Sequence, residues 1–571
     1  MATVPASRVN DPASNSPVAP NPSRQWIVGP WVDFLLIILT PLISTPAVLL
    51  LYSSRVGVSA ETISVIVTAF FALGHHLPGM MRAYGDRELF LRFYWRFVLT
   101  PPLLFVAYFP LYFYHYDLYR AIVLVWATWH ALMQLYGFVR IYDAKVGSVS
   151  AVTAYWDWLL CLFGFVLPQL IRPQQIAVNL ALWHSLGGPQ ISSGLLQAIQ
   201  WGGLAVFTIV LIGFFTNYLI QCYRGPKPSL LKLAMLFTTL GLWWFVMTYV
   251  DNLLLSVAIF DICHDVQYLA IVWLFNCRRV SINPHLGHFI RYVFRRGMVL
   301  LYLGLITAYG ALGLVAPLVL DGVISRIFYA IMFTSTILHY YFDGFIWKVR
   351  DQANVVSLGI ASEKNVSPSL QWTKLRIPHF VKWIPAIGML SLLFSEDLLA
   401  PPMTTSHKNE LEKFYAQSLM GNSILPKDEE ERSWIYSQYD QARIVAETVP
   451  QDRNTQLRFA ILQANFGNND DAIQRLEALS EHFPDDSDIL ITLGGIHFYR
   501  GNADVALKYY LNALENAKTS RHRALANFKL GEHSWFSNNK DDAEFRFAEA
   551  LKYDPRISAS IDLLHNRSRK Q

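Results

Sequence analysis

The sequence predicts an all-α protein in which a polytopic bundle of about eleven transmembrane helices precedes an α-solenoid built from a helical repeat. Three observations support this fold class. The 571-residue chain is 53% hydrophobic with a mean hydropathy of +0.28, which is unusually apolar for a soluble protein. Residues 1–400 hold 26 Lys and Arg against 17 Asp and Glu, whereas residues 401–571 hold 21 against 25. The acidic part also repeats a pattern of small residues with a period of 34.

The apolar part, residues 26–400, is predicted to be the transmembrane domain. Its long runs match the roughly 30 Å hydrocarbon core of a bilayer, and a shorter run lies near 380–396. The stretch 172–198 is expected to be a loop, an interfacial helix or a re-entrant helix. The long runs lie near 31–52, 62–80, 98–115, 120–138, 153–171, 199–220, 233–250, 252–276, 297–318 and 323–346.

Basic residues predict the orientation of these segments. Alternate loops carry 19 Lys and Arg, and the loops between them carry four. Cytoplasmic loops are the ones enriched in Lys and Arg, so the basic loops are expected in the cytoplasm of a bacterium, with the bundle in its inner membrane. If 380–396 crosses, the tail is non-cytoplasmic. The positive surplus therefore indicates membrane topology and no nucleic-acid partner.

The remaining boundaries follow from composition. Residues 1–25, rich in Pro, Ser and Asn, are predicted to be a disordered leader. Residues 401–452 form a linker with a degenerate repeat at about 430–450, and 557–571 form a C-terminal tail. The chain has only four cysteines, none in a CxxC pair, so neither a disulfide framework nor a thiolate zinc site is expected.

Residues 453–556 contain the internal repeat. Small residues and a closing proline recur at a spacing of 34 residues, with a three-residue insertion before the last unit. This pattern resembles tetratricopeptide repeats, which implies stacked helix pairs that bind a protein partner on a concave face. The alternative is a folded cap without a partner. The repeated positions are Gly467, Ala472 and Pro484, then Gly501, Ala506, Tyr510 and Ala513, then Leu530, Gly531, Ala543, Phe547, Ala550 and Pro555.

Four apolar segments carry a histidine at a similar distance from the next basic loop. These are His75 with His76 beside it, His130, His264 and His339. Ionisable residues are costly within a bilayer and mark functional sites by default. Their matched depth predicts one shared intramembrane metal site with these histidines as ligands. The alternative is that each one is a separate hydrogen-bonding residue between helices.

Three of these histidines have a polar neighbour one helical turn away. Gln134 follows His130, Gln267 follows His264, and Asp343 follows His339, each on the same helix face. We expect these three side chains to act beside the metal by orienting imidazoles, and Asp343 could also bind the metal directly. Imidazole and carboxylate ligands suit non-haem iron, and zinc and copper also accept them. Asp261 and Asp265, which flank His264, are further candidates as ligands or proton carriers.

This arrangement resembles the histidine-rich integral-membrane oxygenases, such as fatty-acid desaturases and hydroxylases. The resemblance implies a metal-dependent oxidoreductase that holds non-haem iron near the cytoplasmic face and acts on a lipid or lipid-linked substrate. The HxxxH and HxxHH boxes of those enzymes are absent, and this chain has HH, HxxxQ, HDxQY and HYxxD instead. Neither a di-iron count nor a particular substrate is therefore implied.

Three other readings stay open. Histidines paired across two helices also suit haem b. Membrane glycosyltransferases with a tetratricopeptide tail share this outline, but they usually carry acidic residues in an early non-cytoplasmic loop, where this chain has only Glu61. A membrane-anchored scaffold or assembly factor would need far fewer transmembrane segments than the sequence contains.

Overall fold

The computed structural model describes most of the chain as helix, and no strand occurs among the described residues. The all-α expectation is therefore confirmed. Residues 1–24 of the predicted leader, the segment near 380–396 apart from Gly388, and residues 401–428 of the linker lie outside the described residues. The described residues are 25–53, 56–113, 118–224, 227–250, 252–283, 286–319, 322–347, 354, 357–358, 360, 388 and 429–568.

Seven helical spans in the described part are long and apolar enough to cross a membrane. An eighth is added if the bent pair Pro30–Ile38 and Thr40–Tyr52, which meet at 47°, is one span. The chain is therefore built as a multi-pass membrane protein, whereas the count of eleven stays a prediction. The seven spans are Ala60–Gly85, α7 (Leu118–Lys145), α8 (Ala151–Ile171), α10 (Ser193–Arg224), α11 (Leu230–Tyr249), α12 (Leu253–Ile282) and Val323–Ile346 within α15 (Gly322–Ile346).

The other helices of this part complete the bundle. The stretch 172–198, left open between loop and helix by its sequence, contains α9 (Pro173–Ser185). Span Ala60–Gly85 is built from α3, a π-helical segment η3 and α4. The bounds are α1 (Pro30–Val32), π-helical η2 (Asp33–Ile38), α2 (Thr40–Tyr52), α3 (Ala60–Val67), η3 (Thr68–Leu73), α4 (His76–Gly85), α5 (Arg87–Arg92), α6 (Tyr94–Phe113), α13 (His288–Val293) and α14 (Val299–Val319).

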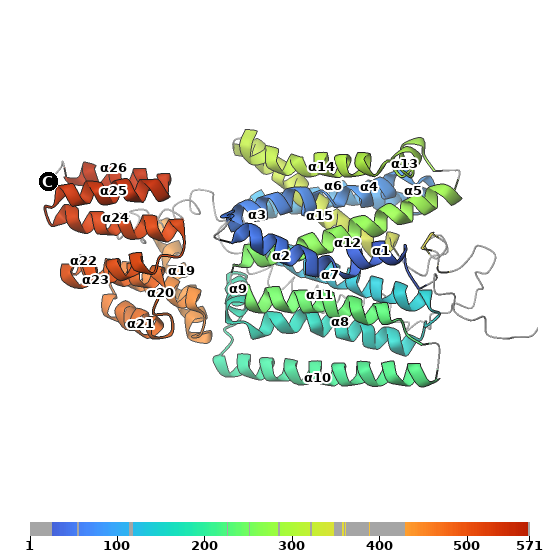
Figure 1. Ribbon diagram of the computed structural model, residues 1–571, viewed down its shortest axis with the longest axis horizontal. Helices are drawn as coiled ribbons and strands as arrows, with labels where there is room; N and C mark the ends of the chain where they lie inside the picture. Colours follow the sequence, from blue (N-terminus) through green and yellow to red (C-terminus); the bar gives the residue numbers. More distant parts are fainter. Residues whose placement is uncertain are drawn as a thin grey trace, which may run out of the picture.

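The helix starts follow local sequence signals. Ser59, Ser150 and Ser229 each accept a hydrogen bond from a backbone N–H of the helix that follows, and Asn252 does the same for α12. Such caps satisfy donors that the first helical turn leaves unpaired. Figure 1 shows the long helices running side by side, with α5 and α13 at one end and α9 at the other. The loops rich in Arg and Lys lie at the α5 and α13 end.

A buried charge cluster ties three helices together near that basic end. The ammonium Nζ of Lys232 on α11 lies 2.8 Å from Asp143 Oδ2 of α7 and 2.7 Å from Asp157 Oδ1 of α8. Arg140 Nη1 contacts the same two carboxylates at 3.1 and 2.8 Å. Lys232, Asp143 and Asp157 are fully buried. Two cations thus balance two carboxylates within the protein interior.

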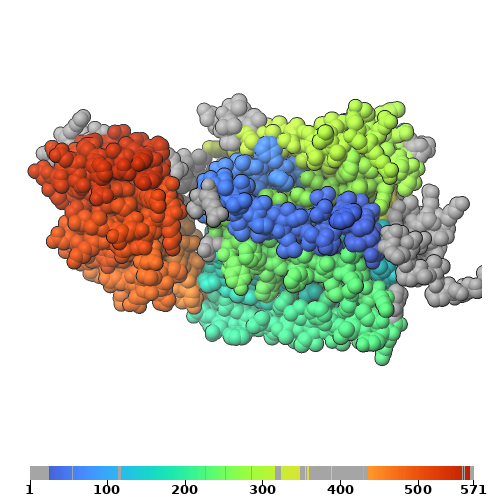
Figure 2. Space-filling view, viewed as in Figure 1, coloured from blue at the N-terminus to red at the C-terminus, as the bar shows by residue number. Residues whose placement is uncertain are grey.

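The tail is a stack of antiparallel helix pairs. The pairs α20–α21, α22–α23 and α24–α25 pack against each other, and α19 precedes them. Figure 2 shows the tail as a compact lobe in orange and red at one end of the bundle. The bounds are α19 (Glu429–Thr448), α20 (Arg453–Asn465), α21 (Asn469–His482), α22 (Ser487–Tyr499), α23 (Ala503–Glu515), α24 (Ser520–Phe536), α25 (Lys540–Tyr553), a short 3-10 turn η6 (Pro555–Ile557) and α26 (Ser558–Ser568).

The small residues of the repeat lie where the paired helices meet. Ala472, Ala506 and Ala543 are completely buried. Gly531 lies against the ring of Phe547, and a Cβ at this position would overlap that ring at 2.5 Å. The periodic small residues therefore allow close helix approach, as the sequence pattern predicts.

Packing of Ala506 gives a direct test of the tail. In a fragment spanning residues 425–571, Ala506→Trp should lower the free energy of unfolding by about 1–3 kcal/mol or more, because the closed interface has no room for an indole. Val505→Trp, at a position that is 39% exposed, is the control and should change little. Urea unfolding followed by circular dichroism measures both. A fragment without helical signal would contradict independent folding, and equal stabilities would contradict the interface.

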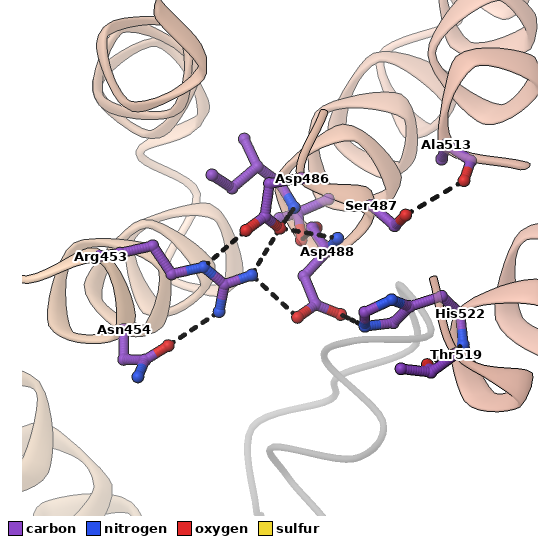
Figure 3. Close-up of polar contacts among 10 residues, drawn as sticks. Arg453, Asn454, Asp486, Ser487, Asp488, Ala513, Thr519 and His522 are labelled. Carbon is purple, nitrogen blue, oxygen red and sulfur yellow. Dashed lines mark hydrogen bonds and ion pairs between the residues drawn. The ribbon is translucent and has the colours of Figure 1, made fainter. Parts of the chain in front are cut away.

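Charged side chains link the first helices of consecutive pairs, as Figure 3 shows. Arg453 of α20 donates from Nε to Asp486 Oδ2 at 2.9 Å and from Nη2 to Asp488 Oδ2 at 2.9 Å. Asp486 also accepts from the backbone N–H groups of Asp488 and Ile489 and so caps α22. The other oxygen of Asp488 lies 3.6 Å from His522 Nε2 of α24.

Acid should weaken this link. Burial by itself raises the pKa of Asp486, but the hydrogen bonds and positive charge of Arg453 together with two backbone N–H donors outweigh burial, so its pKa is below the ordinary 3.8. A carboxylate with a lowered pKa contributes stability above its ordinary pKa and loses it as the pH falls through the folded-state value. Asp486→Asn in fragment 425–571 should thus cost stability at pH 7 and remove part of the acid-dependent loss. Parallel pH profiles of the two proteins would contradict this.

The tail rests on the end of the bundle that lacks the basic loops. Val445 of α19 and Val449, which directly follows this helix, pack with Ile176 and Leu180 of α9 in one buried apolar cluster. Thr448 Oγ1 donates to the backbone oxygen of Ile191 at 3.2 Å. The contact thus joins the tail to the end of the bundle where α8 ends and α10 begins.

Candidate metal centre

Five histidine side chains from four helical spans meet inside the bundle. They come from the η3–α4 junction, α7, α12 and α15, and each is at most 8% exposed. Neighbouring rings of this group have centroids 4.5–5.7 Å apart. The structure therefore brings together all of the histidines that the sequence analysis predicts as metal ligands, namely His75, His76, His130, His264 and His339.

The π-helical segment η3 positions His75. It ends at Leu73, and Gly74 follows, where a Cβ would overlap the backbone oxygen of Phe70 and meet Ile306 of α14 at 2.9 Å. Only glycine therefore allows α14 to pack this closely. Single π-helical turns inside α-helices occur frequently at functional sites. Here the turn immediately precedes the two adjacent histidines.

His339 lies at the centre of the group. Its Nε2 is 3.0 Å from His75 Nε2 and 3.1 Å from His130 Nε2. An imidazole nitrogen carries either one proton or one lone pair in the ring plane. It therefore has one strong hydrogen-bonding direction and cannot serve two nitrogen neighbours equally well. A cation between the three nitrogens would satisfy all of them through their lone pairs.

Contacts on the other side of the His75 ring determine its tautomer. His75 Nδ1 lies 3.0 Å from the backbone oxygen of Phe71 and 2.9 Å from Asp265 Oδ1. Both neighbouring atoms are acceptor oxygens, so Nδ1 carries the proton, which it donates to the Phe71 carbonyl while the Asp265 carboxylate lies beside it. The lone pair of a neutral ring is then on Nε2, facing His339. A distal N–H held by a backbone carbonyl or a carboxylate is typical of metal-binding histidines.

The other two histidines flank this centre. The His264 ring lies 5.3 Å from that of His130 and 5.7 Å from that of His75. The His76 ring stacks on His339 at 4.8 Å, and its Nδ1 is 3.3 Å from Ser335 Oγ. His264 can contribute a nitrogen to a group with His75 and His130 within 4.8 Å of one another. Among the described residues, His76 belongs to neither candidate ligand group.

Asp343 supplies a carboxylate at the edge of the cluster. Its Oδ2 lies 3.8 Å from His339 Nε2, and it forms a second candidate ligand group with His130 and His339. Its Oδ1 accepts hydrogen bonds from Tyr268 Oη at 3.1 Å and Trp347 Nε1 at 3.0 Å. These donors hold one oxygen and leave the other directed towards the imidazoles.

The two glutamines that the sequence placed beside the histidines donate to backbone carbonyls. Gln134 Nε2 donates to the backbone oxygen of His264 at 2.8 Å, and Gln267 Nε2 donates to that of Ile37 at 2.7 Å. Both glutamines line one small cavity together with His264. A role for them in orienting imidazoles stays a prediction, whereas the structure gives that geometry to Asp265.

Two neighbours of the centre have contacts that the sequence does not predict. Asp265 is expected as a ligand or proton carrier, not beside the His75 ring, and Tyr268 is only part of the HDxQY motif. The Tyr268 ring lies 5.4 Å from that of His75 and 5.2 Å from that of His339. An acidic residue next to a histidine in an apolar segment is a usable signal for Asp265, but its contact with His75 depends on which helix lies opposite.

On the side of the cluster that faces the basic loops, α4 packs closely against the histidines and contributes a buried arginine. A Cβ on Gly79 would lie 3.0 Å from Tyr268 Oη and 3.6 Å from His339 Nδ1, so a larger residue would press on the centre. One turn further, Arg82 is 3% exposed, and its guanidinium lies 4.0 Å from the Trp347 ring centroid and 4.3 Å from that of Phe275. These side chains fill the side of the site that faces the basic loops.

Comparison with known proteins adds no family to this description: no family model matches the chain, and no curated protein matches it significantly. The class defined by fold and site is therefore a multi-pass helical membrane protein with a buried cluster of histidines and carboxylates that could hold a metal ion.

Proposed function

We propose that this protein is an integral-membrane, metal-dependent oxidoreductase of the hydroxylase or desaturase type, acting on a lipid or lipid-linked substrate. One observation carries the proposal: three Nε2 atoms, of His75, His339 and His130, converge with separations of 3.0 and 3.1 Å in the interior of the bundle. A hydrogen bond at His339 Nε2 cannot satisfy both contacts equally well, whereas a cation that accepts the lone pairs of these nitrogens would.

The donor set of the cluster consists of imidazole nitrogens and the Asp343 carboxylate, and His130, His339 and Asp343 have donor atoms within 4.8 Å of one another. Imidazoles with a carboxylate suit non-haem iron.

The residues then have distinct roles. His75, His130, His264 and His339 would hold the metal, and Asp343 would bind it or hold a proton beside it. Asp265 keeps the His75 ring in the tautomer that presents Nε2. His76 stacks against His339 and restrains its ring. When bound, iron supplies one-electron and oxygen chemistry, while the protein excludes bulk water from the buried cluster.

The location of the histidine cluster supports a lipid or lipid-linked substrate. The centre lies between apolar spans, and large apolar side chains are exposed along the bundle, among them Leu103 at 65%, Ile209 at 63% and Phe237 at 80%. Molecules dissolved in the bilayer are the ones that such a surface meets. The bent pair, α6, α14 and residues 380–396 would bring the seven spans to the eleven crossings that the sequence predicts.

The tail is proposed to be a tetratricopeptide-repeat domain that binds a protein partner. Its support is the 34-residue spacing of buried small residues between paired helices. We further propose that it lies on the non-cytoplasmic side of a bacterial inner membrane. In support, α19 packs against α9, at the end of the bundle that lacks the Arg-rich loops.

Reporter fusions test the side of the tail. Alkaline phosphatase fused after residue 571 should be active, and green fluorescent protein at the same position should be dark, because the former needs an oxidising compartment and the latter folds poorly there after export. The same reporters inserted after Arg224, in a basic loop, should give the opposite pattern. Cytoplasmic activity at both positions would contradict the proposed topology.

Metal analysis and an optical spectrum of the purified full-length protein test the function. We expect iron at roughly one or two ions per chain, limited by the available ligands, and no Soret band. A Soret band would show that the bound iron is haem and would contradict non-haem iron. Stoichiometric zinc with no redox-active metal would contradict the proposed oxidoreductase function. Protein that binds no transition metal after reconstitution would overturn the metal centre itself.

A further inference from the structure

A basic cleft opens at the end of the bundle that carries the Arg-rich loops. It has a volume of about 430 Å³ and lies between the α4–α5 junction and the start of α13. Pockets of this size hold small ligands or headgroups. It is lined by Tyr84, Gly85, Arg87, Phe90, Leu286, Gly287, His288 and Arg291.

Close packing of α13 on α4 forms the cleft. Ile290 of α13 is 4% exposed, and a Cβ on Gly85 would overlap its side chain. Gly287 passes near the backbone oxygen of Gly85, with a Cβ distance of 3.4 Å. These two glycines let α13 lie against the end of α4, so Arg87 and Arg291 line the same opening from different helices.

The charge of the cleft is positive. Arg87, His288 and Arg291 line it, and all three are exposed. Two carboxylates flank Arg87 in the sequence, and one of them, Asp86, is buried and paired with Arg279 at 2.6–2.7 Å, which neutralises its charge. Glu88 also lies 3.6 Å from Arg279. Two guanidinium groups facing one opening are suited to the oxygens of a phosphate.

Exposed apolar side chains are sequence neighbours of the lining residues. Leu91 follows Phe90 and is 61% exposed, and Phe289 and Tyr292 follow His288 and Arg291 and are 59% and 57% exposed. Aromatic and basic residues together at the ends of spans are typical of the bilayer interface. A ligand whose phosphate lies between the arginines could therefore keep its hydrocarbon chains along these side chains, which a soluble phosphate cannot do.

We infer that this cleft binds the phosphate of an anionic lipid headgroup, with Arg87 and Arg291 as its main contacts. Binding involves no covalent step. The inference goes beyond the proposed function, because the cleft is separate from the histidine cluster and its arginines bind no metal. A failure of either proposal can therefore be recognised without the other.

The test measures phosphatidic acid binding to the delipidated full-length protein in detergent. Native mass spectrometry gives the affinity and thermal unfolding gives the stabilisation, with phosphatidylcholine and glycerol 3-phosphate as comparison ligands. The double variant Arg87→Gln with Arg291→Gln should bind phosphatidic acid on the order of tenfold more weakly. The matched control, Arg295→Gln with Arg296→Gln, removes the same charge at the same end but outside the cleft, and should bind as the natural chain does.

Each outcome decides the inference. Selective loss in the cleft variant, with unchanged metal content, supports it. Equal affinity of the two double variants overturns the site. Equal stabilisation by glycerol 3-phosphate overturns the lipid assignment in favour of a soluble phosphate. If the cleft double variant is not monodisperse, the single variants Arg87→Gln and Arg291→Gln are measured instead, and unchanged affinity in both overturns the inference.

Discussion

Replacing His339 with alanine is expected to abolish metal binding by the purified protein. Its Nε2 is the atom shared by the two shortest contacts between imidazoles, so its loss separates the ligands as well as removing one. The affinity for iron should fall by more than about 100-fold, beyond the 10–100-fold typical of losing a supporting residue. Metal content after dialysis against a chelator measures this effect.

Two further variants sharpen this test. Asp265→Asn keeps the shape of the side chain next to His75 but removes its charge. The affinity for iron should therefore fall by about 10–100-fold, and some iron should stay bound. His184→Ala, in α9 at the opposite end of the bundle, should change nothing. If His339→Ala retains iron at full stoichiometry, the histidines are ordinary hydrogen-bonding residues between helices and not metal ligands.

Lys232→Met is expected to destabilise the membrane bundle severely. Its ammonium is fully buried and contacts Asp143 and Asp157, which Arg140 would then have to neutralise alone. Removing one partner from a buried ion network costs about 3–5 kcal/mol, because a charge is left uncompensated in the interior. The midpoint of thermal unfolding in detergent should fall sharply relative to the natural chain.

Lys227→Met provides the matched control, because Lys227 is exposed three residues before Leu230, where α11 begins. The double variant Lys232→Met with Asp143→Asn should be more stable than Lys232→Met alone, since it restores charge balance. An unfolding midpoint for Lys232→Met equal to that of Lys227→Met would show that the cluster adds nothing to stability.

The close match between expectation and structure at the histidines has a physical origin. A charged or polar residue in an apolar segment has to find a partner inside the protein, and the alternation of basic loops places each segment in the membrane with a known direction. Depth then follows from counting residues along each helix. His75, His130, His264 and His339 could therefore be brought to one level before any contact was known.

Partners across helices could not be derived in the same way. Helical periodicity correctly puts Gln267 near the face of His264, but its amide donates to Ile37, on the π-helical segment η2. Asp265, one residue further round α12 than His264, contacts His75 instead. Which neighbour a helix face meets depends on the rotation and packing of the whole bundle, and small residues such as Gly74 and Gly79 control that packing from other helices.

The sequence by itself determined that the chain is helical, apolar in its first 400 residues, polar and periodic beyond, and marked by histidines at one membrane depth. These properties depend on composition and on spacing along one chain. Tertiary structure alone decided that His75 Nε2 and His130 Nε2 both contact His339 Nε2, that Asp265 lies beside His75, and that Arg87 and Arg291 share a cleft. Such contacts join residues from different helices, and only the packing of those helices brings them within reach.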